Sequence, residues 1–525
     1  MNKFFALAAL VLAGLSFQSC EPMEGLDQDP NRPTQVTPDL LLNGVLVELH
    51  QRGWNDVSRW NQYNACNYNY YGNQEYNWTG ASWSYTTLKN VVKMEEEAAR
   101  LGLPEKNAYS ALAKYLKATF YYRMTMLSGD IPMSEALQPD VTLTPKYDTQ
   151  KQVFLNILNL LDEANSDMAD LTASGSDNFN GDIYYGNDLT MYRKAVNAFT
   201  LRVLIALSKK ADDADLNVKG RFAAIVNNPS QYPLFTSNGD NMEFVHNATF
   251  NKYPTSPDNY GFDALRYNMA ATSLNALVDL QDPRTFLFAE PASALVASGT
   301  SATSYAAFVG APSDEDLADM STKVQNGQYS LYNRYRWYRG FTAENTIVLG
   351  YAEQCFNIAE AAHRGWVAGA NASTYYTQGI QAVHDWYGIT NGTNTVRFLK
   401  ASNDGDLSNS ANYDVYTVNF DQAAYLAGSA VAYSNDANGL SKILTQRYLA
   451  FFQNGGWEGY FQWRRTGIPA FDEGGSGTGN GGVIPKRFLY PSAEVTNNSD
   501  AMNEALQRQF GTTNDNINHE MWVIK

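Results

Sequence analysis

Aromatic and amide side chains gather in one short stretch of the sequence, where they could bind a ligand without reacting with it. Ten tryptophans and tyrosines fall between residues 54 and 85, with asparagines interleaved among them. An aromatic ring offers a flat apolar face, often with a polar tip, and an amide offers both a donor and an acceptor. Because sugars carry both C–H faces and hydroxyls, this combination of residue types favours oligosaccharide binding.

The rings in the middle of this stretch lie in a predicted loop and are the better candidates for ligand contacts. A second aromatic cluster, between residues 329 and 338, adds two more candidates. We predict ligand binding by Asn67, Tyr68, Asn69, Tyr70, Tyr71, Tyr76, Trp78, Trp337 and Tyr338. Large rings are also common in protein cores, so packing is the alternative for each of them. Packing between the first helices is the preferred interpretation for Trp60, Tyr63, Trp83 and Tyr85.

Motifs of common catalytic sites are missing from the sequence. It contains no Gly-x-Ser-x-Gly nucleophile turn and no His-Glu-x-x-His zinc motif. Glu360 and His363 have the one-turn spacing of a metal pair, but a di-iron site needs that pair twice, with further glutamates. We therefore predict no catalytic residue, no metal ligand and no cofactor, while a structural calcium site in an Asp/Asn loop stays open. A glycosidase remains a minor alternative, because its two carboxylates need no sequence motif.

Composition and charge exclude several other classes of protein. The 525 residues are 44% hydrophobic and 18% charged, with 13% aromatics, which is typical of a folded globular protein and not of a disordered chain or a coiled coil. The formal net charge of -16 would repel phosphate backbones, so we predict no nucleic-acid partner. Three cysteines cannot build a disulfide scaffold in a chain of this length.

The N-terminus has the pattern of a signal peptide that ends at a cysteine. Residues 4–15 form an apolar run that is too short to span a bilayer as a helix. The run is followed by Cys20, in a stretch that resembles the lipobox of bacterial lipoproteins, which implies a signal peptide over residues 1–19 and a lipid on Cys20. The acidic, proline-containing residues 20–38 are predicted to be a lipidated tether. Cys355 lies in an apolar helical pattern and is expected to be an ordinary buried thiol.

Apolar residues at spacings of three and four predict pairs of amphipathic helices. The pairs cover residues 88–101 with 109–127, 153–164 with 195–207, and 347–362 with 376–387, and a late helix covers residues 440–451. Repeated helix pairs with short loops favour a mostly α, solenoid-like frame. Residues 229–345 and 391–438 lack this periodicity and are predicted to be irregular, and the six glycines of residues 474–482 predict a mobile loop.

Seven blocks of sequence resemble one protein family, and they occur in family order over nearly the whole chain after Cys20. The blocks are DPNRPTQVTPDLLLNG (29–44), LSGDIPMSEAL (127–137), TPKYDTQKQVF (144–154), LQDPRTF (280–286), YAEQCFNIAEAAHRGW (351–366), WRRTGIP (463–469) and IPKRFLYPSAEVTNN (484–498). Together they resemble the SusD/RagB family of outer-membrane nutrient-binding lipoproteins.

The resemblance implies a fold, a place and a partner. We expect one α-helical domain over residues 39–525, with a tetratricopeptide-like frame of helix pairs and an irregular, loop-rich half that faces the ligand. We also expect a lipid-anchored protein on the outside of the outer membrane that delivers its ligand to a SusC-like TonB-dependent transporter. Residues 282–284 and 464–467 are expected to form buried or capping networks, because the blocks that the family shares are structural.

The resulting hypothesis is a non-catalytic surface protein that binds an oligosaccharide. A peptide-binding protein of the same kind of uptake system is the first alternative, because the family also contains peptide binders. The glycosidase and a purely structural partner of the transporter complete the alternatives.

Overall fold

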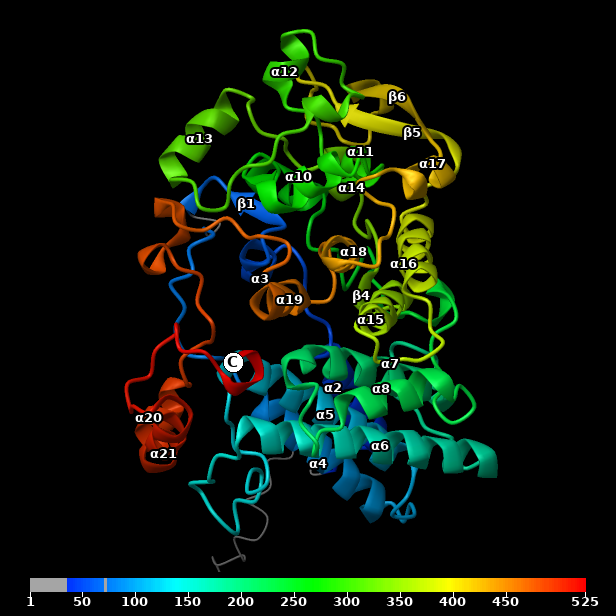
Figure 1. Cartoon of the computed structure of the whole chain (residues 1–525), viewed down its shortest axis with the longest axis vertical. Helices are drawn as coiled ribbons and strands as arrows, with labels where there is room; N and C mark the ends of the chain where they lie inside the picture. The colour runs from blue at the N-terminus through cyan, green and yellow to red at the C-terminus, as the bar shows by residue number, and fades with distance from the viewer. Residues whose placement is uncertain (1–34, 70–72) are drawn as a thin grey trace, which may run out of the picture.

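A layer of α-helices forms one end of the molecule (Figure 1). The computed structural model describes residues 35–69 and 73–525 of the chain. Neighbouring helices of the layer pack against one another, α4 on α5, α5 on α6 and α6 on α7. The layer consists of α2 (Pro38–Val47), α4 (Tyr85–Arg100), α5 (Ala108–Ser128), α6 (Gln150–Ser174), α7 (Leu189–Ala206) and α8 (Val218–Asn227).

Local sequence signals set the ends of these helices. Asn107 and Ser110 form a reciprocal capping box at the start of α5, and Gly129 follows its last residue. The Thr149 side chain caps the start of α6, and Gly175 ends that helix with φ 69°, a left-handed conformation that glycine adopts without strain. These caps, together with the periodic apolar residues, explain why the helix pairs could be predicted.

A second set of longer helices lies beyond this layer. They are α15 (Tyr351–His363), α16 (Ala372–Trp386), α18 (Ala437–Ala450) and α19 (Glu458–Thr466). The helices α15 and α16 pack as an antiparallel pair. Helix α15 also contacts α18 of the same set and α7 of the first layer. The three predicted helix pairs and the predicted late helix are therefore confirmed, although α6 continues to Ser174, α7 begins at Leu189, and residues 347–349 lie in a strand and not in α15.

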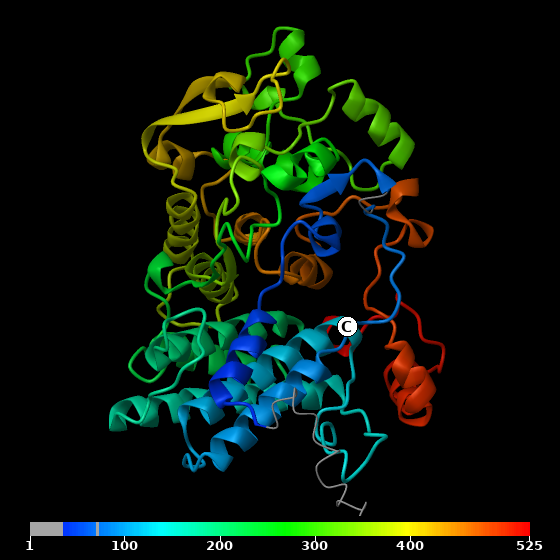
Figure 2. The same cartoon turned by 180° about the vertical axis from the view of Figure 1, so that it is seen from behind.

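Most of the short helices and two-stranded ribbons lie toward the opposite end of the molecule, whereas the ribbon that contains Thr346–Leu349 lies in the middle, near α15 (Figures 1 and 2). The ribbons are antiparallel and pair β1 (Asn64–Cys66) with β3 (Tyr267–Met269), β2 (Met242–Phe244) with β4 (Thr346–Leu349), and β5 (Gly392–Leu399) with β6 (Tyr413–Phe420). The short helices are α3 (Asp56–Trp60), α9 (Tyr260–Asp263), α10 (Ala271–Asp279), α11 (Arg284–Phe288), α12 (Ser293–Ala297), α13 (Leu317–Gln325), α14 (Arg334–Trp337) and α17 (Gln422–Ala427).

Among residues 35–69 and 73–525, one large hydrophobic core runs through both ends of the molecule, with two small satellite clusters. One satellite lies under the C-terminal helices α20 (Ser492–Asn497) and α21 (Ser499–Phe510). Within the described ranges, no helix combines the length and the apolarity needed to cross a bilayer. The structure thus has the predicted class, a mostly α frame of helix pairs with an irregular half.

The glycine-rich residues 474–482 are packed, in contrast to the prediction of a mobile loop. The amides of Gly475 and Gly477 donate hydrogen bonds to the side chain and the carbonyl of Asp314, at 3.1 and 2.9 Å. The Thr478 carbonyl accepts a hydrogen bond from the Tyr76 amide at 2.7 Å. Glycine is required here for close approach, because a Cβ atom on Gly477 would collide with the carbonyl oxygen of Glu315.

Candidate functional site

Groups that could support catalysis are occupied by structural contacts. Glu360 is fully buried between Arg465 and Arg364, whose nitrogens lie 2.8 and 2.9 Å from its carboxylate oxygens. His363 shares a hydrogen bond of 2.8 Å with the Tyr433 hydroxyl. The glutamate and the histidine therefore do not act as a metal pair, and the described residues contain no cluster of three or more His, Cys, Asp or Glu side chains placed for a metal.

Both cysteines in the described ranges are buried free thiols. Burial raises the pKa of Cys355 to about 12 and also raises the pKa of Cys66. Since the thiolate is the nucleophilic form, neither side chain is reactive at neutral pH. The expectation of an ordinary buried thiol at Cys355 is confirmed.

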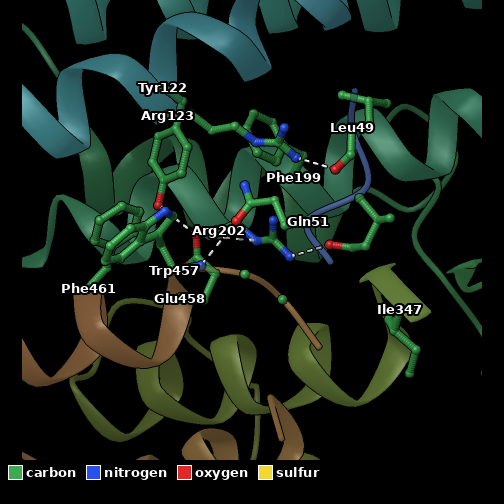
Figure 3. A pocket seen from close by; sticks show the side chains of 13 residues that line it. Leu49, Gln51, Tyr122, Arg123, Phe199, Arg202, Ile347, Trp457, Glu458 and Phe461 are labelled. Carbon is green, nitrogen blue, oxygen red and sulfur yellow. Dashed lines mark hydrogen bonds and ion pairs between the residues drawn. The ribbon is translucent and has the colours of Figure 1, made fainter. Parts of the chain in front are cut away.

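A charged cavity lies where the helical layer meets α19 (Figure 3). Its volume of about 20 Å³ is enough for one water molecule and not for a sugar. Arg202 of α7 forms a bidentate pair with Glu353 of α15 at 2.7 and 2.5 Å, and the Tyr122 hydroxyl donates to Glu458 of α19 at 3.2 Å. Burial, together with the neighbouring Glu353, raises the pKa of Glu458 although Arg202 opposes the shift.

The same kind of buried pairing occurs in the sequence blocks that were expected to be structural. Asp282 and Arg284 are fully buried and form two hydrogen bonds of 2.8 and 2.7 Å. Arg464 donates to the carbonyl oxygens of Lys486 and Met126, both at 2.8 Å. Arg284 also donates to Gln446 of α18 at 2.8 Å, so both arginines join distant segments and the expectation of buried networks is confirmed.

Two rings predicted to bind a ligand, Tyr76 and Trp78, belong to the core. Tyr76 is fully buried and donates its hydroxyl proton to the Trp60 carbonyl at 2.9 Å. Trp78 is 5% exposed and stacks on Phe488 with ring centroids 4.1 Å apart. A ring enclosed by other side chains presents no free face to a ligand. Their assignment to the ligand site is therefore corrected to packing.

Trp337 and Tyr338 are also core residues. Both are fully buried, and the Trp337 indole donates to the Phe288 carbonyl at 3.1 Å. Trp54 packs against both rings. Their assignment to the ligand site is corrected for the same reason, since neither ring reaches solvent.

The four rings that were expected to pack do so. Tyr63 is buried, and its hydroxyl donates to the Tyr448 carbonyl at 2.8 Å. Trp60, Trp83 and Tyr85 are partly buried and pack against the main core. The packing interpretation is confirmed for all four.

The remaining candidates lie in and after the turn that follows β1. Tyr68 is 48% exposed and Asn69 is exposed, with its Oδ1 atom accepting a hydrogen bond from Asn73 at 3.1 Å. Asn67 is buried, and its side chain donates to the Leu265 carbonyl at 3.2 Å, which makes it a support for the turn. Tyr70 and Tyr71 lie outside the described residues.

Pairing of β1 with β3 brings Leu265 and Arg266 to this turn, and Phe262 lies a few residues earlier in the same segment. The guanidinium of Arg266 lies 4.8 Å from the centre of the Tyr68 ring. Phe262 and Leu265 are 66% and 53% exposed in the segment just before β3. Sequence reasoning missed all three, because they are separated from the turn by nearly 200 residues and belong to no motif. We name Tyr68, Asn69, Phe262, Leu265 and Arg266 the Tyr68 surface.

A buried carboxyl group supports the Tyr68 surface from below. Asp263 lies between Phe262 and Leu265 in sequence and accepts a hydrogen bond from the Asn259 amide at 3.0 Å. Burial raises the pKa of Asp263 to about 6, although the neighbouring Tyr338 hydroxyl opposes the shift. The hydrogen bond from Asn259 therefore holds Asp263 in the segment whose exposed side chains form the surface.

Chemically, the Tyr68 surface can bind but cannot catalyse. It offers an aromatic face, two apolar side chains, an amide and a guanidinium, and it has no exposed carboxylate pair or nucleophile among its members. A ring face and hydrogen-bond groups together match a ligand that has C–H faces and polar substituents.

Comparisons with known proteins identify the family of the chain and support its fold. Residues 30–491 match the SusD-like family described as starch-binding and associating with the outer membrane. A SusD homologue from Bacteroides fragilis NCTC 9343 is 32% identical, with a TM-score of 0.79, and the match covers 93% of this chain and 100% of the homologue. An outer membrane protein of Bacteroides vulgatus ATCC 8482 assigned to nutrient binding is 29% identical, with a TM-score of 0.76 over 93% of this chain and 100% of the other.

A chitin-binding SusD homologue from Flavobacterium johnsoniae has the same fold, with a TM-score of 0.65, 21% identity and coverage of 92% of this chain and 97% of the homologue. A comparison with curated proteins finds no match. The family model covers most of the chain, and the solved structures have the same helical frame as this chain. The chain therefore belongs to the SusD-like family of outer-membrane-associated nutrient-binding proteins, which bind their ligands without catalysis.

Proposed function

We propose that this protein binds an oligosaccharide on the Tyr68 surface and delivers it, chemically unchanged, to a SusC-like TonB-dependent transporter. The observation that carries the proposal is the half-exposed Tyr68 ring, which lies beside the Arg266 guanidinium and the exposed Asn69 amide. A sugar ring stacked on Tyr68 would place its hydroxyls within the range of these donors and acceptors.

The family description and two chitin-binding relatives support a carbohydrate as the ligand class. Stacking of a flat group on one aromatic ring contributes about 1 to 3 kcal/mol, by analogy with bases stacked on rings. A single surface of this kind binds weakly, and attachment beside a transporter would raise the effective concentration of the captured ligand.

Isothermal titration with maltooligosaccharides, chitooligosaccharides and other soluble glycans tests the ligand class. We expect wild-type protein to bind at least one of them, and Tyr68→Ala to weaken that binding about tenfold or more. Phe250→Ala is the matched control, because Phe250 is also a highly exposed ring and is not a member of the Tyr68 surface. Binding of a protein digest in place of every glycan would contradict the proposal and favour a peptide ligand.

The absence of chemistry is tested on the bound glycan itself. Incubation of the purified protein with that glycan is expected to leave the number of reducing ends constant. An increase in reducing ends that scales with the amount of protein would replace the proposal with a glycosidase.

We propose that a lipid on Cys20 anchors the protein in the outer membrane, with its ligand surface outside the cell. Two or three acyl chains would make the attachment effectively permanent, since each buried CH₂ contributes about 0.8 kcal/mol. Metabolic labelling with palmitate is expected to mark the wild-type protein and not Cys20→Ala. A labelled Cys20→Ala protein would contradict the anchor, and protease treatment of intact cells tests the surface location.

The transporter is tested as a physical partner. Affinity purification of the tagged, lipidated protein from solubilised outer membranes is expected to recover a TonB-dependent barrel in near-equal amount. Recovery of the protein alone under several mild detergents would contradict delivery through such a complex.

A further inference from the structure

Two guanidinium groups converge on one tyrosine ring at the end of the molecule opposite the helical layer. The centre of the Tyr335 ring lies 4.9 Å from the guanidinium carbon of Arg339 and 5.1 Å from that of Arg397. Arg339 also donates a hydrogen bond to the Tyr335 hydroxyl at 3.1 Å. We name these three side chains the Tyr335 clamp.

Neither arginine of the clamp is neutralised by the protein. In the part of the chain that the structure describes, no carboxylate oxygen lies within 4.0 Å of either guanidinium. Nearby carboxylates have other partners. Glu290 is engaged by Arg334 at 3.0 Å, and Glu344 is engaged by Arg336 at 2.7 Å.

Asp414, on the strand that pairs with β5, lies 3.9 Å from Lys400. Two positive charges on one ring are unexpected in a chain with a formal net charge of -16. Among the described residues, the only hydrogen bond of these two guanidiniums is the one from Arg339 to the Tyr335 hydroxyl, so their other N–H groups are available to an anion beside the ring.

The elements around the clamp hold it in place. Tyr335 and Arg339 lie in and just after α14, whose start is capped by the Asn333 side chain at 3.1 Å from the Arg336 amide. Arg397 lies on β5, and α14 packs against this strand (Figure 1). Tyr413 of β6 meets the Tyr335 ring edge-on at 5.1 Å, so the ring between the two arginines is fixed before any ligand arrives.

The clamp is connected to the Tyr68 surface through α9. Tyr260, the first residue of α9, packs on Tyr338 one residue before Arg339, with ring centroids 6.3 Å apart. Phe262 of the same short helix is a member of the Tyr68 surface. A third arginine, Arg266, repeats the arrangement of a guanidinium on a tyrosine ring and has no ion pair among the described residues.

We propose that the Tyr335 clamp binds the carboxylate or sulfate groups of an acidic glycan, and that it makes the protein selective for anionic oligosaccharides. The inference rests on the proposed oligosaccharide-binding function and adds the chemical class of the ligand. Guanidinium groups bind carboxylates and sulfates through paired N–H donors.

Titration with three polymers of different charge tests the proposal at fixed ionic strength. The probes are polygalacturonate fragments, which carry carboxylates, dextran sulfate, which carries sulfates, and neutral dextran. We expect the wild-type protein to bind at least one acidic polymer more tightly than dextran. The polymer that binds identifies the anionic group.

The double variant Arg339→Gln/Arg397→Gln is expected to lose about a hundredfold in affinity for the acidic polymer, or about tenfold for each guanidinium. The matched control is Lys89→Gln/Lys219→Gln, which removes the same charge from α4 and α8 and should lose far less. Circular dichroism establishes that both variants are folded. Arg339→Lys/Arg397→Lys keeps the charge and is expected to recover only part of the affinity, because lysine lacks the planar fork.

Equal losses in the Arg→Gln and Lys→Gln double variants would overturn the clamp and indicate a general charge effect. Binding of a neutral glycan without any preference for acidic polymers would overturn the clamp and leave the proposed function intact. If no glycan of either class binds, the proposed function fails together with this inference.

Discussion

Trp78 and Tyr68 are ten residues apart in the same aromatic stretch, and the structure gives them opposite roles. Trp78 is surrounded by other rings, with Phe488 stacked on it at 4.1 Å and Trp60 at 5.3 Å. Tyr68 has a guanidinium beside its ring and remains half exposed. Aromatic composition alone therefore does not separate packing from binding. The residues that the fold places around each ring decide whether it is buried or stays exposed.

The largest expected effect is the loss of stability when the packed ring of Trp78 is removed. Trp78→Ala would remove a buried ring from its cluster and leave a cavity, so we expect the free energy of unfolding to fall by about 3 to 5 kcal/mol. Denaturant titration measures the change, and Trp78→Phe should lose much less. A loss below about 1 kcal/mol in Trp78→Ala would contradict the packing role.

Gly477→Ala tests whether the glycine-rich segment is part of the packed region. An added Cβ would collide with the Glu315 carbonyl, and we expect a loss of stability of about 1 to 3 kcal/mol by thermal or denaturant unfolding. The control is Gly261→Ala on α9, where a Cβ meets no atom within 4 Å. Equal stability of the two variants would indicate that residues 474–482 form a mobile loop, as the sequence predicted.

A smaller effect on stability is expected at Asp263, which lies in the segment that carries Phe262 and Leu265. The folded protein holds the Asp263 proton up to about pH 6, whereas an unfolded aspartate releases it near about pH 4. Because the folded state binds more protons between these values, the Asp263 contribution lowers stability as the pH rises from about 4 to 6.

Asp263→Asn removes this titration, so we expect wild type to lose about 2 kcal/mol of stability between pH 4 and pH 7 that the variant keeps. Unfolding curves at several pH values measure the difference. An identical pH profile in the two proteins would show that the carboxyl is not desolvated in the folded state.

The smallest expected change in stability is at Tyr68. Tyr68→Ala should alter the free energy of unfolding by no more than about 0.5 kcal/mol, because the ring is half exposed and lies outside the core. Denaturant titration of this variant beside Trp78→Ala sharpens the contrast. A loss comparable to that of Trp78→Ala would mean that Tyr68 is a structural residue.

Much of the frame could be predicted because its signals are local. Periodic apolar residues and capping side chains such as Asn107 and Thr149 define α4 to α7, α15 and α16 within the sequence itself. The helix α2 was missed because apolar residues lie on nearly all its sides, with Leu40 and Val47 exposed. The hairpin of β5 and β6 was missed because threonines and asparagines weaken its alternation.

The site was only partly predictable. Tyr68 and Asn69 were found by composition, but Phe262, Leu265 and Arg266 join them only through the pairing of β1 with β3. In the second cluster, sequence reasoning selected Trp337 and Tyr338, which are buried, and passed over Tyr335, which is partly exposed between two arginines. Which side of α14 faces the core depends on distant segments such as Phe288 and β5, and the local sequence does not contain that information.

Hydroxyl-radical footprinting with and without a bound oligosaccharide tests the central claim most directly, because it reports the exposure of individual rings. We predict that the ligand protects Tyr68 and Phe262 from oxidation and leaves the exposed Phe250 unchanged. Unaltered oxidation of Tyr68 and Phe262 at a saturating ligand concentration, with protection elsewhere, would contradict binding at the Tyr68 surface.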